Sequence, residues 1–490
     1  MSSAETTGGA AVLRDGAQFK ESLRDGRAVW VGGRKVEDVT EEPSLGPGID
    51  LLAEMFDAQH DPHYEDATTY VDESGQRVTR AWQVPRTIED LRQRRKLIEY
   101  TTVKTVGTFG RPPDLAPLIG IGLLARKPLF AASDPPFFRN DAAFADNIDR
   151  YVEFGRNSNV IAAEVLADPQ TNRAGAAGDS PGLLRVVRQE DDGVYIRGAK
   201  SVGSIAAQAN EIIFTNLLRP DFPPEACIWA AVPVATEGVK LVCREGVSKP
   251  GADPFDHPIA HKGEESDQFI IFEDVFLPND RLFNVGDPEL LKLYGPVTVW
   301  AHWHILTRLW VKAEIFVGTA QLVVDALGTA KFPQVRAYMA DLMQYAHTLK
   351  AFVLAAENLA APTEGGVIAP EVTLLTAGRL HSIEEYPRII HVLQELCGQG
   401  LVMRFQKADF DNPEIGPLLD ELLPGNEITA RDKNRLMNFV WDLTTDSHAG
   451  RTELFENVNA TPAPFLKERL YGEYPRAQLV DTVRDLAGLG

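Results

Sequence analysis

The secondary-structure pattern of this chain changes twice, and that order constrains the fold more than any single motif does. From Pro47 to about residue 150, apolar residues mostly recur at helical spacing. Short runs rich in β-branched residues follow, separated by turn residues, and from about Pro288 to Gly400 long helical patterns return. Because strands and helices do not alternate, a doubly wound sheet is disfavoured. The pattern predicts an α+β fold with helices first, then a β domain, then a helical bundle.

We expect an N-terminal, mostly helical domain at 1–150, a central β domain at 151–285, and a C-terminal bundle with a tail at 286–490. In the first part, a helix from Gly16 precedes a hairpin with Gly32-Gly33 at its turn, and Thr87 caps another helix. Residues 144–166 are expected to form one helix. The central runs predict a small antiparallel barrel or sandwich, with a hairpin turn at Asp191-Asp192. These runs are 184–188, 194–197, 211–215, 228–232, 239–243 and 269–272.

Charge and cysteine content exclude several classes of protein. Lys and Arg number 49 against 70 Asp and Glu, so the formal net charge is −21, which argues against nucleic acid and anionic membranes as partners. The three cysteines are scattered and form no CxxC pair, so neither a metal site nor a disulfide framework is expected. No signal pattern and no run of about 18 apolar residues occurs. The sequence therefore predicts a cytoplasmic protein.

Two histidines flank Trp303 at the start of the long helical region. Imidazole is the side chain that most readily acts as a base near neutral pH. Residues two apart on a helix do not share a face, so one of His302 and His304 is expected to point into a pocket. The other would pack or be solvated. A plain core or surface position stays the ordinary alternative for either ring.

Three further polar positions have simple structural explanations when each is taken alone. Arg111 precedes Pro112-Pro113-Asp114, and a guanidinium before a fixed turn suits an anion. From spacing alone, however, a pairing between Arg111 and Asp114 is favoured. Ser204 and Asn459 lie in segments that are typical of turns. None of these positions predicts a function without the others.

Two other motifs are set aside on context. Gly120, Gly122 and Ala125 match part of a dinucleotide fingerprint, but the preceding strand and the βαβ unit are missing. His60 and His63 have the spacing of metal ligands on a helical turn, yet no third and fourth ligands follow at a typical distance. We interpret the second motif as a solvated turn.

Taken together, these segments resemble the 4-hydroxyphenylacetate 3-hydroxylase family of two-component, reduced-flavin-dependent monooxygenases, and its chlorophenol 4-monooxygenase branch more closely. The resemblance extends over nearly the whole chain and implies an acyl-CoA dehydrogenase-like fold with a central β-barrel and a C-terminal four-helix bundle. The segments that carry it are 25–32, 110–114, 168–173, 200–204, 242–245, 272–278, 300–304 and 455–462.

At two positions this chain differs from the phenylacetate hydroxylases, and both differences concern the residues expected to bind the substrate. The phenylacetate hydroxylases have a Tyr four residues after the motif Arg, where this chain has Leu115, and a His near the position of Glu164. The chlorophenol branch resembles this chain instead, and that resemblance gives the substrate-site roles to Arg111, His302 and Asn459. It also implies flavin contacts at Ser204, Gln170, Gly398 and Gly400, of which the two glycines would approach the phosphates from a neighbouring subunit.

The resemblance implies an enzyme that hydroxylates a phenolic or hydroxypyridine ring through a C4a-hydroperoxyflavin. FADH2 would come from a separate NAD(P)H:flavin reductase and O2 would be the co-substrate, with His302 as the base. A halide or nitro group on the attacked carbon would be expelled. Alternatives are an acyl-CoA dehydrogenase-like oxidase or dehydrogenase and a non-catalytic flavin-binding protein. A homo-dimer or homo-tetramer is expected. The family's iron–sulfur dehydratase activity is set aside, because no cysteine precedes Cys227.

Overall fold

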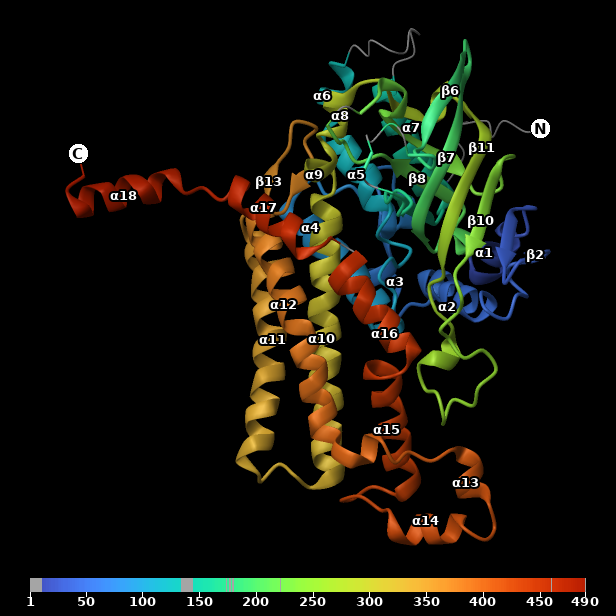
Figure 1. The fold of residues 1–490 in the computed structure, drawn as a ribbon, viewed down its shortest axis with the longest axis vertical. Coiled ribbons are helices and arrows are strands. Elements are labelled where there is room, and N and C mark those ends of the chain that lie inside the picture. Colours follow the sequence, from blue (N-terminus) through green and yellow to red (C-terminus); the bar gives the residue numbers. More distant parts are fainter. Residues whose placement is uncertain are drawn as a thin grey trace.

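A computed structural model describes residues 11–133, 144–172, 174–175, 178, 180–220, 222–459 and 461–489. Figure 1 shows long bundle helices along the vertical axis, a β region at the upper right, and the first helices packed between and below these parts. The last helix extends away from the body at the left. The described residues contain no helix that is long and apolar enough to cross a membrane.

The element order follows the predicted segregation of helices and strands. The first part contains α1 (Gly16–Ser22), β1 (Ala28–Val31), β2 (Arg34–Val36), α2 (Gly46–Asp57), α3 (Glu65–Thr68), β3 (Thr69–Val71), β4 (Arg77–Thr79), α4 (Ile88–Lys104), α5 (Pro117–Ala125), α6 (Lys127–Ala131) and α7 (Phe144–Ser158). The β region contains β5 (Ala162–Val165), β6 (Arg185–Glu190), β7 (Gly193–Ser204), β8 (Glu211–Thr215), β9 (Ile228–Pro233), β10 (Val239–Cys243), β11 (Asp267–Pro278) and β12 (Leu282–Val285).

The helical part begins with two short helices and continues with long ones. It contains α8 (Pro288–Leu291), α9 (Tyr294–Val297), α10 (Val299–Leu327), α11 (Pro333–Asn358), β13 (Ala361–Pro362), β14 (Ile368–Ala369), α12 (Val372–Cys397), α13 (Lys407–Asp411), α14 (Gly416–Leu422), α15 (Ala430–Thr444), α16 (Ser447–Leu454), the π-helical turn η9 (Phe455–Asn459), α17 (Ala463–Glu473) and α18 (Ala477–Ala487).

The β region is two open sheets packed face to face, so of the two predicted arrangements the sandwich is observed and the closed barrel is not. Among the described strands, one sheet has the order β2-β1-β10-β11-β7-β6 and the other has the order β12-β9-β8-β5. Both have unpaired edge strands, and the pairs β1–β10 and β5–β8 are parallel. The inner faces bury one apolar cluster between the sheets, where Phe214 and Phe272 lie 5.1 Å apart between ring centroids. Stacking two sheets thus covers the apolar faces without closing a barrel.

Several local predictions are confirmed and one is wrong. Strands β1 and β2 form the expected hairpin, β6 and β7 meet at Asp191-Asp192, and Thr87 caps α4 with a capping box. The helix expected over 144–166 ends at Ser158 instead. Asn159 then adopts a left-handed conformation (φ 48°), and the chain continues as β5. Helical spacing does not distinguish this short apolar strand from one more helical turn.

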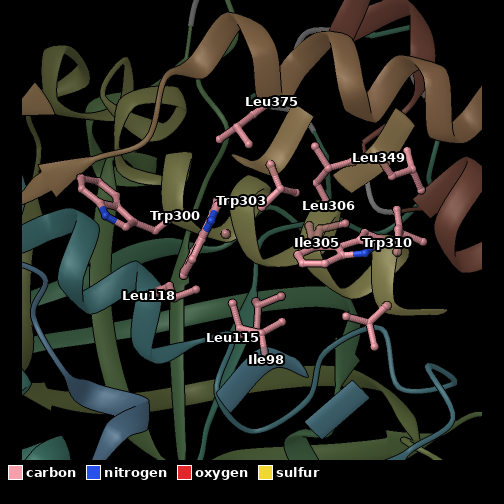
Figure 2. Close-up of a cluster of buried hydrophobic side chains, with 14 of the residues drawn as sticks. Ile98, Leu115, Leu118, Trp300, Trp303, Ile305, Leu306, Trp310, Leu349 and Leu375 are labelled. Atoms are coloured by element: carbon pink, nitrogen blue, oxygen red, sulfur yellow. The ribbon is translucent and has the colours of Figure 1, made fainter. Parts of the chain in front are cut away.

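The core of the bundle is centred on α10, which packs between the N-terminal helices and α11 and α12. Figure 2 shows Trp300, Trp303 and Trp310 of α10 among aliphatic side chains from the neighbouring elements. The indole N–H of Trp303 donates to Glu357 Oε1 at 3.0 Å, so this buried ring leaves no unsatisfied donor. Helix α5 packs close beside this region. A Cβ on its Gly122 would lie 2.0 Å from the carbonyl oxygen of Val297, so this glycine serves helix packing and not nucleotide binding.

Candidate active site

A cavity of about 660 Å³ lies between the β region and the start of the bundle. Its walls come from the ends of β5 and β7, from α9 and α10, and from η9 and α17. Four predicted site residues line it together: Arg111, Ser204, His302 and Asn459. They come from four distant segments, so their convergence is a property of the fold.

His302 is the histidine that faces this cavity. It lies in the first turns of α10, is 8% exposed, and its Nδ1 has no hydrogen-bond partner among the described residues. Burial lowers the pKa of His302 well below its usual value, and the positive charges of Arg469, Arg379 and Arg111 act in the same direction. The imidazole is therefore neutral near pH 7 and has a lone pair that can accept a proton, although the same burial makes it a weaker base than a free imidazole.

His304 points to the other side of the helix, as the spacing predicts. It is fully buried, and its Nε2 lies 2.9 Å from Asp114 Oδ2. Burial opposes ionisation of Asp114, but His304 and Arg94 more than offset it and lower the pKa of this carboxyl. The expected pairing of Arg111 with Asp114 is thus wrong, because Asp114 lies in the interior and accepts hydrogen bonds there.

Arg111 is held by its backbone and by an aromatic ring. Its backbone N–H donates to Glu265 Oε2 at 2.6 Å, and the N–H of Gly110 donates to Oε1 of the same carboxylate at 2.5 Å. The guanidinium carbon lies 4.9 Å from the ring centroid of Phe455. A stacked guanidinium keeps its planar orientation and can still donate to an anion in the cavity.

Gly110 is a sensitive point for this arrangement. A Cβ at this position would lie 2.2 Å from Cε1 of Phe455, so the ring that supports Arg111 would have to move. We expect Gly110→Ala to lower the free energy of unfolding by about 1–3 kcal/mol through overpacking and to weaken substrate binding. Urea denaturation and a substrate titration measure the two effects. Unchanged affinity would show that the Phe455 stack does not position Arg111.

A buried hydrogen-bond network joins the Ser204 side of the cavity to the Arg111 loop. Ser204 Oγ donates to Asp267 Oδ1 at 2.7 Å, and Arg451 bonds both Asp267 and Glu265. Burial opposes ionisation of Asp267, but Arg451 and Arg244 outweigh it and lower the pKa of this carboxyl. Glu265 in turn holds the backbone before the motif proline. One chain of ionic contacts therefore fixes two walls of the cavity relative to each other.

The segment that carries Asn459 is anchored by a buried charge cluster, which we define as Arg308, Lys312, Arg379 and Glu456. Arg308 pairs with Glu456 through both carboxylate oxygens, with Nη2 at 3.0 Å from Oε2. Burial raises the pKa of Glu456, but the neighbouring cations, Arg308 foremost, overcome this and lower it to about 2. Burial also lowers the pKa of Lys312 to about 7.

Glu164 is a cavity residue to which the sequence gave no role. It lines the same cavity, and its Oε1 is buried without a hydrogen-bond partner among the described residues. Burial raises the pKa of this carboxyl, whereas the charge of Arg111 lowers it. Its departure from the family pattern was the only signal in the sequence. Tyr294 shares the wall, and burial raises the pKa of its phenol well above the usual value.

The other predicted cofactor residues do not reach this cavity within one chain. Gln170 is exposed on the loop after Asp168, and Asp168 itself bonds the buried Lys200 at 2.8 Å. Gly398 and Gly400 line a separate cavity of about 730 Å³ at the C-terminal end of α12. Figure 1 shows that end of the bundle far from α9 and α17.

Two groups of residues have side chains of the kind that ligate metals. His60 and His63 are exposed at a turn, as we expected. Elsewhere in the described chain, His257, Asp442 and Asp446 place possible ligand atoms within 4.8 Å of one another. Asp442 already accepts hydrogen bonds from His257 and from the backbone of Ile259 and Ala260, so this group holds a loop against α15.

An open β domain packed on a helical bundle, with a cavity at their junction, is the fold of the acyl-CoA dehydrogenase-like flavoproteins. A crystal structure of the oxygenase component of 4-hydroxyphenylacetate 3-monooxygenase complexed with FAD aligns with a TM-score of 0.90 and 28% identity, covering 96% of this chain and 98% of that one. The family models described as 4-hydroxyphenylacetate 3-hydroxylase N terminal and C terminal match residues 15–284 and 294–488. The chain belongs to this family.

Relatives with known names are similar over most of their length. The oxygenase component of a 4-nitrophenol 4-monooxygenase/4-nitrocatechol 2-monooxygenase from Rhodococcus opacus is 35% identical, covering 98% of this chain and 92% of that protein. The FADH2-dependent monooxygenase TftD from Burkholderia cepacia is 33% identical, covering 92% and 87%. A 2,4,6-trichlorophenol monooxygenase from Cupriavidus pinatubonensis is 32% identical over the same shares.

Proposed function

We propose that this chain is the oxygenase component of a two-component, FADH2-dependent monooxygenase that acts on a phenolic ring. The observation that carries the proposal is the meeting of a neutral imidazole and a stacked guanidinium in one cavity with a serine hydroxyl on its wall. Family membership and the similarity to named aromatic monooxygenases support it. Reduced FAD, when bound, supplies the electrons with which O2 is activated for transfer to the ring.

His302, Arg111 and Asn459 have different roles towards the substrate. His302, held neutral by burial, accepts the phenolic proton, which makes the ring carbons ortho and para to the oxygen more nucleophilic. Arg111 then stabilises the phenolate oxygen, and Asn459 lines the same part of the wall. The buried apolar side chains of Leu291 and Leu466 line part of the remaining wall and limit water there.

The separation between the candidate active-site cavity and the cavity at Gly398 and Gly400 bears on whether the protein is an oligomer. Gly398 and Gly400 lie at the end of the 26-residue helix α12, and at about 1.5 Å per residue this helix spans roughly 39 Å. If these glycines bind flavin phosphates, they do so in a site completed by a second copy of the chain. We propose a homo-oligomer on this ground, supplied with reduced flavin by a separate reductase.

Isotope transfer from O2 tests the proposed reaction. The protein is mixed anaerobically with reduced FAD and a panel of phenols and then exposed to ¹⁸O2. We expect ring-hydroxylated product with one ¹⁸O atom, detected by mass spectrometry. If every phenol leaves all the oxygen as hydrogen peroxide, the chain is an oxidase or a flavin-binding protein and the proposal is wrong.

Arg111→Lys gives a second test of the assignment. Lysine keeps the positive charge but loses the planar stack on Phe455 and the second donor nitrogen. We expect the KM for the phenol to rise by about tenfold, which corresponds to one lost charge-assisted hydrogen bond. Steady-state kinetics with a fixed concentration of reduced FAD measures this. An unchanged KM would remove Arg111 from substrate binding.

A further inference from the structure

Glu164 occupies a position where a carboxylate is unusual. It is the third residue of β5, which pairs in parallel with β8 at Ile213. Its neighbours Ala163 and Val165 are buried in the apolar cluster between the sheets. Since side chains alternate along a strand, Glu164 is directed to the opposite side, which is the wall of the cavity.

No group of the protein satisfies this carboxyl fully. Among the described residues, Oε1 of Glu164 has no hydrogen-bond partner although it is buried. Buried polar atoms are satisfied in the great majority of native structures, so an unpaired one inside a ligand cavity indicates a partner supplied by the ligand or by water. A carboxylate oxygen accepts hydrogen bonds and attracts positive charge, and it repels another carboxylate.

The charged residues around Glu164 leave its carboxyl free to interact with a ligand. Among the described residues that line the cavity, Glu164 is the one acidic side chain, while Arg111, Lys292 and Arg469 are cationic. Burial raises the pKa of Glu164, and the positive charge of Arg111 opposes this rise without cancelling it. The other polar residues of the lining include Ser204, Tyr294, Thr298, His302 and Asn459.

We propose that Glu164 determines substrate choice by accepting a hydrogen bond from a second ring substituent, such as a hydroxyl or amino group, and by excluding phenols that carry a carboxylate. The proposal rests on the proposed function, because it takes the cavity to be the phenol site. It assigns the substrate class as hydroxyl- or amino-substituted phenols. Phenols with an acidic side chain are poor substrates in this assignment.

Binding measurements on two variants test this assignment without relying on turnover. The protein with saturating reduced FAD is titrated anaerobically at pH 8 by calorimetry with catechol, 4-aminophenol, 4-methylphenol and 4-hydroxybenzoate. The wild type should bind the first two more tightly than 4-methylphenol and 4-hydroxybenzoate most weakly. Glu164→Leu should erase the preference for catechol over 4-methylphenol, a change of about tenfold. Glu164→Gln should improve the binding of 4-hydroxybenzoate by about tenfold or more.

A control separates this role from a general effect of charge. Glu211→Gln removes another buried carboxylate from the adjacent strand β8, where Glu211 pairs with Arg281 outside the cavity, and should leave the order of ligands unchanged. Because Glu164 has an unsatisfied oxygen, its Gln and Leu variants should melt no lower than the wild type. If both variants keep the wild-type order of ligands, the inference is wrong and the phenol site stands. If no phenol binds the wild type, the proposed function itself fails.

Discussion

Replacement of His302 by Gln is expected to lower kcat for ring hydroxylation by about 10²- to 10⁴-fold, the usual contribution of a general base. Glutamine fills a similar volume and keeps a polar end, but it cannot take up a proton. Since the imidazole is neutral and its Nδ1 has no protein partner, its removal leaves no broken ion pair behind. We therefore expect the melting temperature to change little. Single-turnover product formation with reduced FAD measures the rate.

The pH dependence gives an independent check on this base. Because burial lowers the pKa of His302 well below 6.5, the base form persists throughout the range from pH 6 to 8, and the wild-type rate should not fall over that range through protonation of this residue. His391→Gln is the matched control, because His391 lies exposed on α12 away from the cavity. Full turnover by His302→Gln between pH 6 and 8 would remove the base assignment.

Glu456→Gln is expected to be the most destabilising single substitution near the site. It removes the carboxylate that Arg308 contacts through both nitrogens and leaves Arg308, Lys312 and Arg379 in a buried position. Loss of one partner from a buried ion pair costs about 3–5 kcal/mol, since the remaining charge is neither solvated nor paired. Urea denaturation measures the change. We also expect η9 to be held less firmly against α10, and substrate binding by Asn459 to weaken as a result.

The same pair predicts how stability depends on acid. The pKa of Glu456 is lowered to about 2 in the folded protein, so its stabilising contribution is present above the unfolded value near 4.5 and is lost as the pH falls towards 2. Glu456→Gln should lack this part of the acid transition. Glu468→Gln, which alters an exposed carboxylate on α17, should keep it and change the stability by less than about 0.5 kcal/mol. Equal stability of the two variants would contradict the role of the buried cluster.

The sequence predicted elements well where local chemistry decides them. The capping box at Thr87, the hairpin turns and the long helices of the bundle depend on neighbours in the chain and are confirmed, whereas the helix expected over 144–166 ends at Ser158. It was also predictable that His302 and His304 point to different sides of the same helix, because this follows from helical geometry alone. The domain boundaries at 150 and 285 stay a prediction, and β1 already joins β10 of the central sheet from the first part of the chain.

What the sequence did not predict depends on contacts between distant segments. Asp114 was expected to pair with Arg111 three residues away, but it bonds His304 of α10 instead. Strand spacing left a barrel and a sandwich as alternatives, and the choice between them depends on how the inner faces of the two sheets cover each other. The same holds for Glu164, whose strand looked like the end of a helix and whose carboxyl faces a cavity that only the folded chain creates.

The hydrogen bond between Ser204 and Asp267 has a consequence for any ligand that reaches this wall. A serine hydroxyl has a single proton, and here it is committed to an ionised carboxylate that two arginines keep charged. Only lone pairs of the Ser204 oxygen are left for the cavity. A ring nitrogen that binds there must bring its own hydrogen. A flavin with N–H at that nitrogen, the reduced form, satisfies this condition, whereas the oxidised form would present one lone pair to another.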